Sequence, residues 1–171
     1  MLKQFYRLKP LLWLPVAVFV NNHIVSVTFI EGRSMQPALN PDTNRLRKDF
    51  VLLNKFVSGS FSKTHLKKGD VVTLYNPQEP EELITKRIIA MPGDSVFPNT
   101  NSRFFKYAPI NIPEGHCWIE GDEGFHSFDS NSFGYVPLGL IQSKVSFVLY
   151  PFYRFGFVQS KIPNWKISRI S

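Results

Sequence analysis

Hydrophobic positions along the chain follow two patterns, one continuous apolar run near the N-terminus and many short alternating runs after it. The continuous run covers residues 11–20 and follows three basic residues, Lys3, Arg7 and Lys9. Basic residues ahead of an apolar run are typical of a membrane segment. A full crossing needs about 20 residues, so an anchor over residues 9–27 has to include Asn21, Asn22 and His23. Polar groups are costly in lipid, which places these three at an interface or against a partner.

A removable signal peptide is the alternative interpretation of this segment. Its small-residue cleavage pattern is missing, because Asn22-His23-Ile24 has no A-x-A arrangement. We therefore predict a retained basic N-terminus and membrane anchor over residues 1–27. One β-rich domain with a short basic C-terminal tail should follow over residues 28–171.

Beyond His23, apolar and polar positions alternate with the period of a β-strand. Val25, Val27 and Phe29 alternate with Ser26 and Thr28. Further strand candidates cover residues 49–56, 70–75, 83–91, 117–120 and 145–150. Turns that contain proline, glycine or asparagine separate them. Strands at this spacing predict a compact, mostly antiparallel β fold behind an N-terminal membrane helix.

The charge balance narrows the classes of partner. The 20 Lys and Arg against 13 Asp and Glu give a formal net charge of +7, which attracts nucleic acid or anionic lipid. Zinc-finger spacing, an RNP-type aromatic motif and a long basic helix are all missing from the sequence. We therefore favour a basic surface near membrane lipid and expect no nucleic-acid partner.

One cysteine and four histidines limit the other chemistry. Cys117 excludes an internal disulfide, and its place in the apolar run HCWI predicts a buried structural thiol. His116 would point away from Cys117, because neighbours in a strand face opposite sides. The histidines at positions 23, 65, 116 and 126 lack metal-ligand spacing. We expect neither a metal nor a cofactor.

Three segments are candidates for chemistry, although the GxSxG, HExxH, Walker and GxGxxG signatures are missing. The first is EGRSMQP, in which Ser34 lies between an apolar segment and a proline. Alone, this pattern is more often a simple turn. The second is residues 121–134, GDEGFHSFDSNSFG. Its small polar residues predict a loop with hydrogen bonds between side chains and backbone, and such a loop can supply a hydroxyl that orients an amine.

The third segment is LITKRIIAMPGD, read as a strand over residues 83–91. Alternation places Lys86 on one face and Arg87 on the other, so that one of the two cations faces the interior. Lys86 shares its face with Ile84, Ile88 and Ala90. An alternative is a lysine that extends its head to water. Burial disfavours the charged amine, and a neutral Lys86 can take the proton of Ser34 as the hydroxyl attacks a carbonyl. A Ser–Lys pair is a known nucleophile–base arrangement.

In their order along the chain, serine segment, lysine segment and polar loop, the three segments resemble the motifs of the signal peptidase I family. The matching stretches are GRSMQP, KRIIAMPGD and GD followed by SFDS, and the resemblance runs over residues 27–140. It implies a β-rich peptidase with Ser34 as nucleophile and Lys86 as general base. It further implies that Ser127 binds the amine of Lys86, and that Asp122 and Asp129 brace the loop.

Two positions depart from the pattern of bacterial family members. Gly32 stands where many of them have a serine whose hydroxyl assists the oxyanion hole, so the hole here rests on backbone N–H groups such as that of Ser34. Asn131 stands where the bacterial loop continues with arginine, so a salt bridge from that position to Asp122 is not expected.

Within the family, the sequence is most similar to the mitochondrial branch. That likeness implies extended segments of membrane-tethered precursors as substrates, a second peptidase subunit as partner, and an inner membrane location with the catalytic domain facing the intermembrane space. A bacterial plasma-membrane signal peptidase and a non-catalytic membrane-tethered scaffold remain as alternatives. A scaffold needs neither Ser34 nor Lys86, which argues against it.

Overall fold

The computed structural model describes residues 13–41, 48–57, 66–99, 108–124 and 127–170. Its helices are α2 (Leu14–His23), α3 (Ser130–Phe133), η2 (Leu138–Leu140), η3 (Phe152–Arg154) and α4 (Asn164–Ile167). Its longer strands are β1 (Val25–Phe29), β2 (Phe50–Asn54), β3 (Val71–Tyr75), β4 (Leu83–Ala90), β7 (His116–Glu120) and β9 (Ile141–Tyr150). Two-residue strands are β5 (Ser95–Val96), β6 (Ile110–Asn111), β8 (Val136–Pro137) and β10 (Gly156–Phe157).

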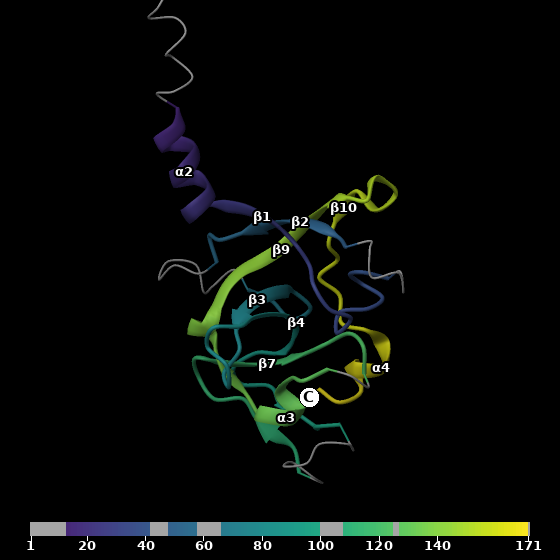
Figure 1. Cartoon of the computed structure of the whole chain (residues 1–171). Coiled ribbons are helices and arrows are strands. Elements are labelled where there is room, and N and C mark those ends of the chain that lie inside the picture. The colour runs from purple at the N-terminus through teal and green to yellow at the C-terminus, as the bar shows by residue number, and fades with distance from the viewer. Residues whose placement is uncertain (1–12, 42–47, 58–65, 100–107, 125–126, 171) are drawn as a thin grey trace, which may run out of the picture.

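The main sheet has eight strands in the order β1-β2-β9-β3-β4-β7-β8, with β10 paired to β9. Every one of these pairs is antiparallel. Figure 1 shows the sheet curling, with β9 running from the β3 side to the β2 and β10 side. The prediction of a mostly antiparallel β fold is confirmed. All five predicted strands beyond residue 48 are present, with bounds that differ by a few residues.

Strand β9 begins four residues before its predicted start, at Ile141. Its alternating buried positions include Ser143, which is 1% exposed. The Ser143 hydroxyl lies 2.5 Å from the Thr73 hydroxyl on β3. Because this inward position is polar and satisfied by a cross-strand hydrogen bond, the hydrophobic pattern did not reveal it.

Three apolar clusters fill the body of the protein. One lies around Val72, Leu74, Ile88 and Ile119. A second joins the segment after β1 to β2 and β9, and includes Met35, Leu39, Val51 and Val148. A third packs Ile89, Ala90 and Trp118. Strand β4 therefore contributes to two clusters, which covers both of its faces.

The N-terminal helix projects from the sheet at the upper left of Figure 1. Helix α2 has ten residues, and no helix among the described residues is long and apolar enough to cross a membrane. The basic N-terminus and the first residues of the predicted anchor lie outside the described residues, which begin at Trp13. Its predicted end, residues 25–27, belongs to β1, because Val25 and Val27 pair with Asn54 and Leu52 of β2.

Candidate active site

Ser34 lies in the loop between β1 and β2, and buried side chains hold that loop from beneath. Met35 and Leu39 are 2% and 0% exposed and pack into the cluster beneath the loop. The Asn40 amide donates to the carbonyl oxygens of Ile30 and Gly32 at 2.8 and 3.1 Å. Since the loop is tied to the sheet on both sides of Ser34, the position of its hydroxyl is restricted.

A second set of contacts closes the same loop against the C-terminal part of the chain. Asp49 accepts from the backbone N–H of Asn40 at 2.8 Å, and Asn40 accepts from that of Asp49 at 2.7 Å. Arg154 forms an ion pair with Asp49 and donates to the carbonyl oxygen of Ala38 at 2.5 Å. The sequence did not predict these contacts, because Asp49 and Arg154 are 105 positions apart and neither belongs to a motif.

Gly32 precedes Ser34 in a backbone conformation that favours glycine. Its φ is +83°, and no heavy atom lies within 4 Å of where a Cβ would stand. The glycine is therefore required by backbone geometry rather than by lack of space. A serine at this position would be strained in this conformation.

Lys86 is buried on β4, at 4% exposure. Its Nζ donates to Oγ of Ser127 at 3.1 Å. Burial lowers the pKa of Lys86 below the ordinary lysine value. Asp129 and Glu82 raise that pKa, and Lys166 lowers it further, so that the net shift is downward. A lysine with a lowered pKa carries a larger neutral fraction and is a better base at neutral pH.

The predicted single face for Lys86 needs two corrections. Arg87 is also buried, at 3% exposure, so both faces of β4 point into the protein rather than one. Ala90 packs with Ile89 and Trp118 instead of with Ile88. A register shift between Ile88 and Ala90 in the pairing with β7 accounts for this change of face.

The loop after β7 meets the serine loop at Gly121. The N–H of Gly121 donates to Ser127 Oγ at 3.1 Å and to Asp129 Oδ2 at 3.0 Å. The N–H of Glu123 donates to the carbonyl oxygen of Ser34 at 3.0 Å. A Cβ on Gly121 would lie 2.3 Å from Ser127 Oγ and 2.5 Å from Ser34 O. Only glycine fits where the two loops touch.

Asp129 and Asn131 pair with each other within this loop. Asp129 Oδ1 accepts from the backbone N–H and from the side-chain amide of Asn131, at 3.1 and 3.0 Å. Asp129 thereby caps α3 while its other oxygen binds Gly121. Asn131, which stands where bacterial members have arginine, thus supports Asp129.

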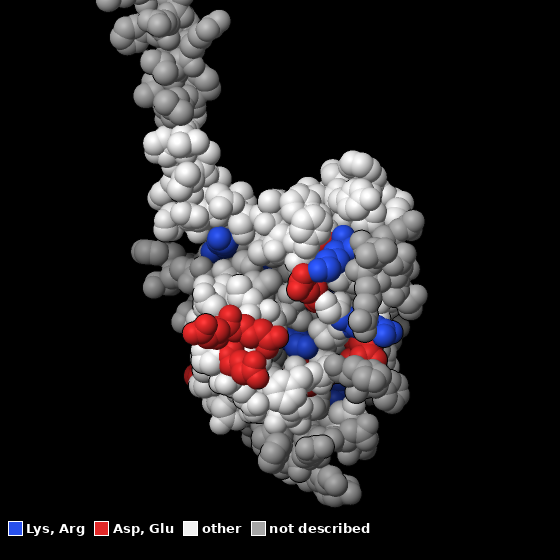
Figure 2. All heavy atoms as spheres, viewed as in Figure 1, with Lys and Arg blue, Asp and Glu red and all other residues white. Residues whose placement is uncertain are grey.

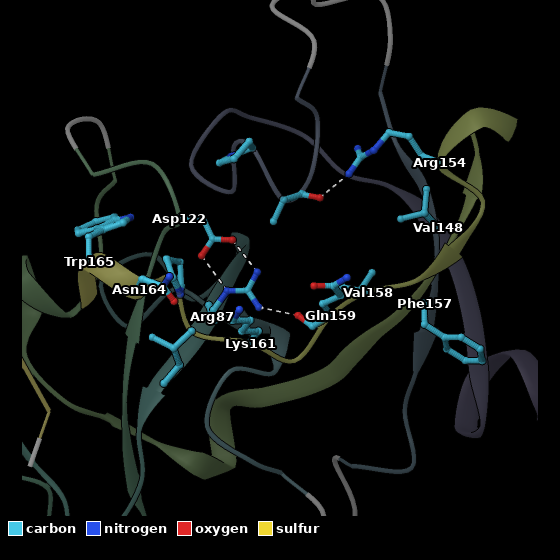
Figure 3. Close-up of a pocket in the computed structure, with 14 residues that line it drawn as sticks. Arg87, Asp122, Val148, Arg154, Phe157, Val158, Gln159, Lys161, Asn164 and Trp165 are labelled. Carbon is cyan, nitrogen blue, oxygen red and sulfur yellow. Dashed lines mark hydrogen bonds and ion pairs between the residues drawn. The ribbon is translucent and has the colours of Figure 1, made fainter. Parts of the chain in front are cut away.

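Asp122 finds its partner on β4. Arg87 binds it through two parallel hydrogen bonds, Nε to Oδ1 at 2.8 Å and Nη2 to Oδ2 at 2.6 Å. Nη1 of Arg87 donates to the carbonyl oxygens of Gly69 and Gln159, at 2.6 and 2.9 Å. Figure 3 shows the two side chains facing each other. The sequence contained one signal for this pair, the adjacent cations of β4, but it did not identify Asp122 as the partner.

Two pockets flank these loops. One, of about 590 Å³, is lined by both Ser34 and Lys86, with apolar walls from Phe29, Leu53 and Ile84. The other, of about 570 Å³, lies against the C-terminal segment and is lined by Arg87, Asp122, Arg154 and Trp165. Because Ser34 and Lys86 line only the first, the predicted chemistry belongs to that pocket.

Other reactive groups are placed differently. Cys117 is fully buried, and burial raises the pKa of its thiol to about 12, which confirms the prediction of a structural thiol. Within the described part of the chain, no group of three His, Cys, Asp or Glu side chains could hold a metal ion. His65 and His126 lie outside the described residues.

Comparisons with known proteins agree with the geometry. The sequence model described as signal peptidase, peptidase S26, matches residues 7–104. Mitochondrial inner membrane protease subunit 2 of Schizosaccharomyces pombe is 49% identical over 145 residues, which cover 85% of this chain and 76% of that protein. The human subunit 2 is 41% identical over 149 residues, covering 87% and 81%. Subunit 1 of Schizosaccharomyces pombe is 37% identical over 145 residues, covering 83% and 86%. The predicted similarity to the mitochondrial branch of the family is confirmed.

Proposed function

The chain belongs to the signal peptidase family, peptidase S26, and on this basis we propose that it is a serine endopeptidase of the mitochondrial inner membrane. Ser34 is the nucleophile and Lys86 the general base. The observation that carries this proposal is the buried Lys86, which lines the same pocket as Ser34 and whose amine donates a hydrogen bond to Ser127. No histidine is needed, since the neutral amine can serve as the base.

The reaction proceeds in two steps, acylation of Ser34 and hydrolysis of the acyl-enzyme. Oγ of Ser34 attacks the scissile carbonyl while its proton moves to Nζ of Lys86, and backbone N–H groups stabilise the oxyanion. The C–N bond then breaks as Lys86 gives that proton to the leaving amine, which leaves an acyl-enzyme. Water attacks the ester, Lys86 accepts one of its protons, and Ser34 leaves as the hydroxyl with that proton returned. Ser127 holds the amine in line throughout.

The substrate is an extended segment beside a strand edge. β4 pairs with β3 from Leu83 to Arg87, whereas its pairing with β7 begins only at Arg87. Among the described strands, residues 83–86 therefore keep a free edge, and Leu83, Ile84 and Thr85 line the pocket. A peptide backbone can add to such an edge through main-chain hydrogen bonds.

The site should lie close to the bilayer, because the helix that precedes β1 exposes apolar residues. Trp13, Leu14 and Phe19 are 57–69% exposed, and Phe152 and Phe157 of the β9–β10 region are 80% and 84% exposed. The upper part of the surface, with α2 and the β9–β10 loop, is mostly uncharged (Figure 2). We propose that the segment before β1, residues 9–24, anchors the chain, with the peptidase domain facing the intermembrane space. We also propose a second peptidase subunit as partner, since the relatives are named as subunits 1 and 2.

Cleavage should depend on pH in the manner of a lysine base. The pKa of Lys86 is lowered chiefly by burial, and only the neutral amine accepts a proton. Activity should therefore be low at acidic pH, rise as pH passes the folded-state pKa of Lys86, and level off above it. The measurement is kcat/KM of the full-length protein on a membrane-tethered precursor across pH. A profile that is flat from mildly acidic to alkaline pH would contradict a lysine base.

Membrane attachment can be tested on native mitochondria. The full-length protein should stay in the membrane pellet after alkaline carbonate extraction. Protease added after rupture of the outer membrane should digest the domain that follows residue 27, while a matrix protein in the same sample stays intact. Release by carbonate would contradict a spanning anchor, and protection of the domain would mean the opposite orientation.

A further inference from the structure

The short C-terminal helix α4 buries a lysine. Lys166 is 1% exposed, which is rare for a lysine unless its charge is paired. Its Nζ forms an ion pair with Glu120 Oε2 at 2.8 Å and donates a hydrogen bond to the carbonyl oxygen of Gly121. Lys166 lies outside the three motif segments, and the mechanism above does not use it.

Glu120 is shared between two cations of the C-terminal segment. Arg169 binds the same oxygen at 2.6 Å, and Trp118 Nε1 donates to the other oxygen at 2.9 Å. Burial alone would raise the pKa of Glu120, but Lys166 and Arg169 outweigh burial and hold that pKa below its usual value. Glu120 is therefore ionised at neutral pH. Its cluster with Lys166 and Arg169 has one more cation than carboxylates, while the carboxylate of Asp129 contacts the N–H of the same Gly121 at 3.0 Å.

Gly121 joins this cluster to the proposed base. Its carbonyl oxygen accepts from Lys166, and its N–H donates to Ser127 Oγ at 3.1 Å. Ser127 Oγ in turn accepts from Lys86 Nζ at 3.1 Å. A continuous series of contacts thus runs from Lys166 through Gly121 and Ser127 to Lys86.

We infer that Lys166 is a positioning residue that holds Gly121 and Ser127 against the amine of Lys86. The inference rests on the proposed function, because it gives the C-terminal segment a part in preparing the base. Lys166 holds the carbonyl oxygen of Gly121 in place. This contact restricts the turn at Gly121, and the N–H of the same residue donates to Ser127 from that turn. The positive charge of Lys166 also favours the neutral form of Lys86.

Several charged groups surround Lys86 and act on it in opposite directions. Asp129 on the loop before α3 and Glu82 just before β4 favour its protonated form, whereas Lys166 on α4 favours its neutral form. Glu31 and Arg33 of the serine loop line the same pocket. Removing Lys166 should therefore shift the acid limb of the activity profile to higher pH, and removing the charge of Glu82 should shift it to lower pH.

The test compares Lys166→Met, Lys166→Arg and Glu82→Gln with the unmodified full-length protein, as kcat and KM across pH. For Lys166→Met we expect the acid limb at higher pH and a loss of kcat at neutral pH, about tenfold for each pH unit of displacement, which recovers at alkaline pH. KM should change little, because Lys166 does not line the pocket that holds Ser34 and Lys86. Lys166→Arg should restore the original limb, and Glu82→Gln should displace it in the opposite direction.

An acid limb of Lys166→Met at its original pH, with only a lower melting temperature, would overturn the inference. If Lys166→Met does not fold, Lys166→Gln is measured instead, because it keeps a donor near the carbonyl of Gly121. Failure of both to fold would assign Lys166 to stability alone and would also overturn the inference.

A measurement without cleavage separates this inference from the proposed function. In the inactive Ser34→Ala background, the side-chain NMR signal of ¹³C-labelled Lys86, assigned with Lys86→Arg, can be titrated directly. It should titrate at higher pH when Lys166→Met is added. An unchanged titration would overturn the role of Lys166, whereas failure of the proposed function would appear as cleavage that survives Ser34→Ala.

Discussion

Replacing Ser34 by alanine should abolish cleavage, and replacing Lys86 by methionine should have the same effect. Each change removes one member of the nucleophile–base pair, and the expected loss of kcat is on the order of 10⁴ or more. The double variant should be little worse than either single variant, because residues that act as one unit give non-additive losses. The measurement is turnover of a membrane-tethered precursor by the full-length protein and its variants.

The control for these two variants is a lysine away from the pocket. Lys68 forms an exposed ion pair with Asp94 at 3.0 Å, so Lys68→Met should keep near-normal turnover. Melting temperatures of all variants establish that they are folded. A folded Lys86→Met with near-normal turnover would show that another group is the base, and equal losses that multiply in the double variant would argue against a pair acting together.

The sequence predicted the strands as short runs bounded by turn residues. Strands β2, β3, β4 and β7 lie where these runs placed them. Only β2 alternates buried and partly buried positions along its whole length, whereas β3, β4 and β7 are buried at consecutive positions. The start of β9 was hidden because Ser143 stands at an inward position and is satisfied by Thr73. Ala90 changed face because of a bulge, which no alternation pattern reports.

The sequence predicted the motif residues of the candidate site but not the contacts that hold them in place. Ser34, Lys86 and Ser127 belong to three short segments that the sequence displays in order, and the structure places Ser127 on the Lys86 amine. The supports are contacts between residues far apart in sequence. Lys166 and the carbonyl of Gly121 are 45 positions apart, and Gln159 and Arg87 are 72 positions apart. Such contacts depend on how the C-terminal segment folds back, and composition and spacing do not specify that path.

The second large effect should come from the buried pair of Arg87 and Asp122, whose side chains are 4% and 2% exposed. Arg87→Met leaves the carboxylate of Asp122 buried without its partner and removes the donor to the carbonyl oxygens of Gly69 and Gln159. Breaking one side of a buried ion pair costs about 3–5 kcal/mol of the free energy of unfolding. For a chain of this size, that corresponds to a fall in melting temperature of roughly 6–20 °C.

The matched control removes both charges. In Arg87→Met with Asp122→Leu, no buried charge is left unpaired, and replacement of a buried ion pair by apolar residues is often close to neutral. The double variant should therefore regain most of the melting temperature that Arg87→Met loses. If it stays as unstable as Arg87→Met, the loss comes from the two orphaned carbonyl oxygens and from packing rather than from charge. If Arg87→Met melts at the original temperature, the ion pair contributes nothing to stability.

The regained stability of the double variant should not restore full activity, because Asp122 follows Gly121 directly. Without Arg87 to hold it, the turn that presents Ser127 to Lys86 is free to shift. Turnover that remains low in a stable double variant would therefore separate the contribution of this pair to the site from its contribution to the fold.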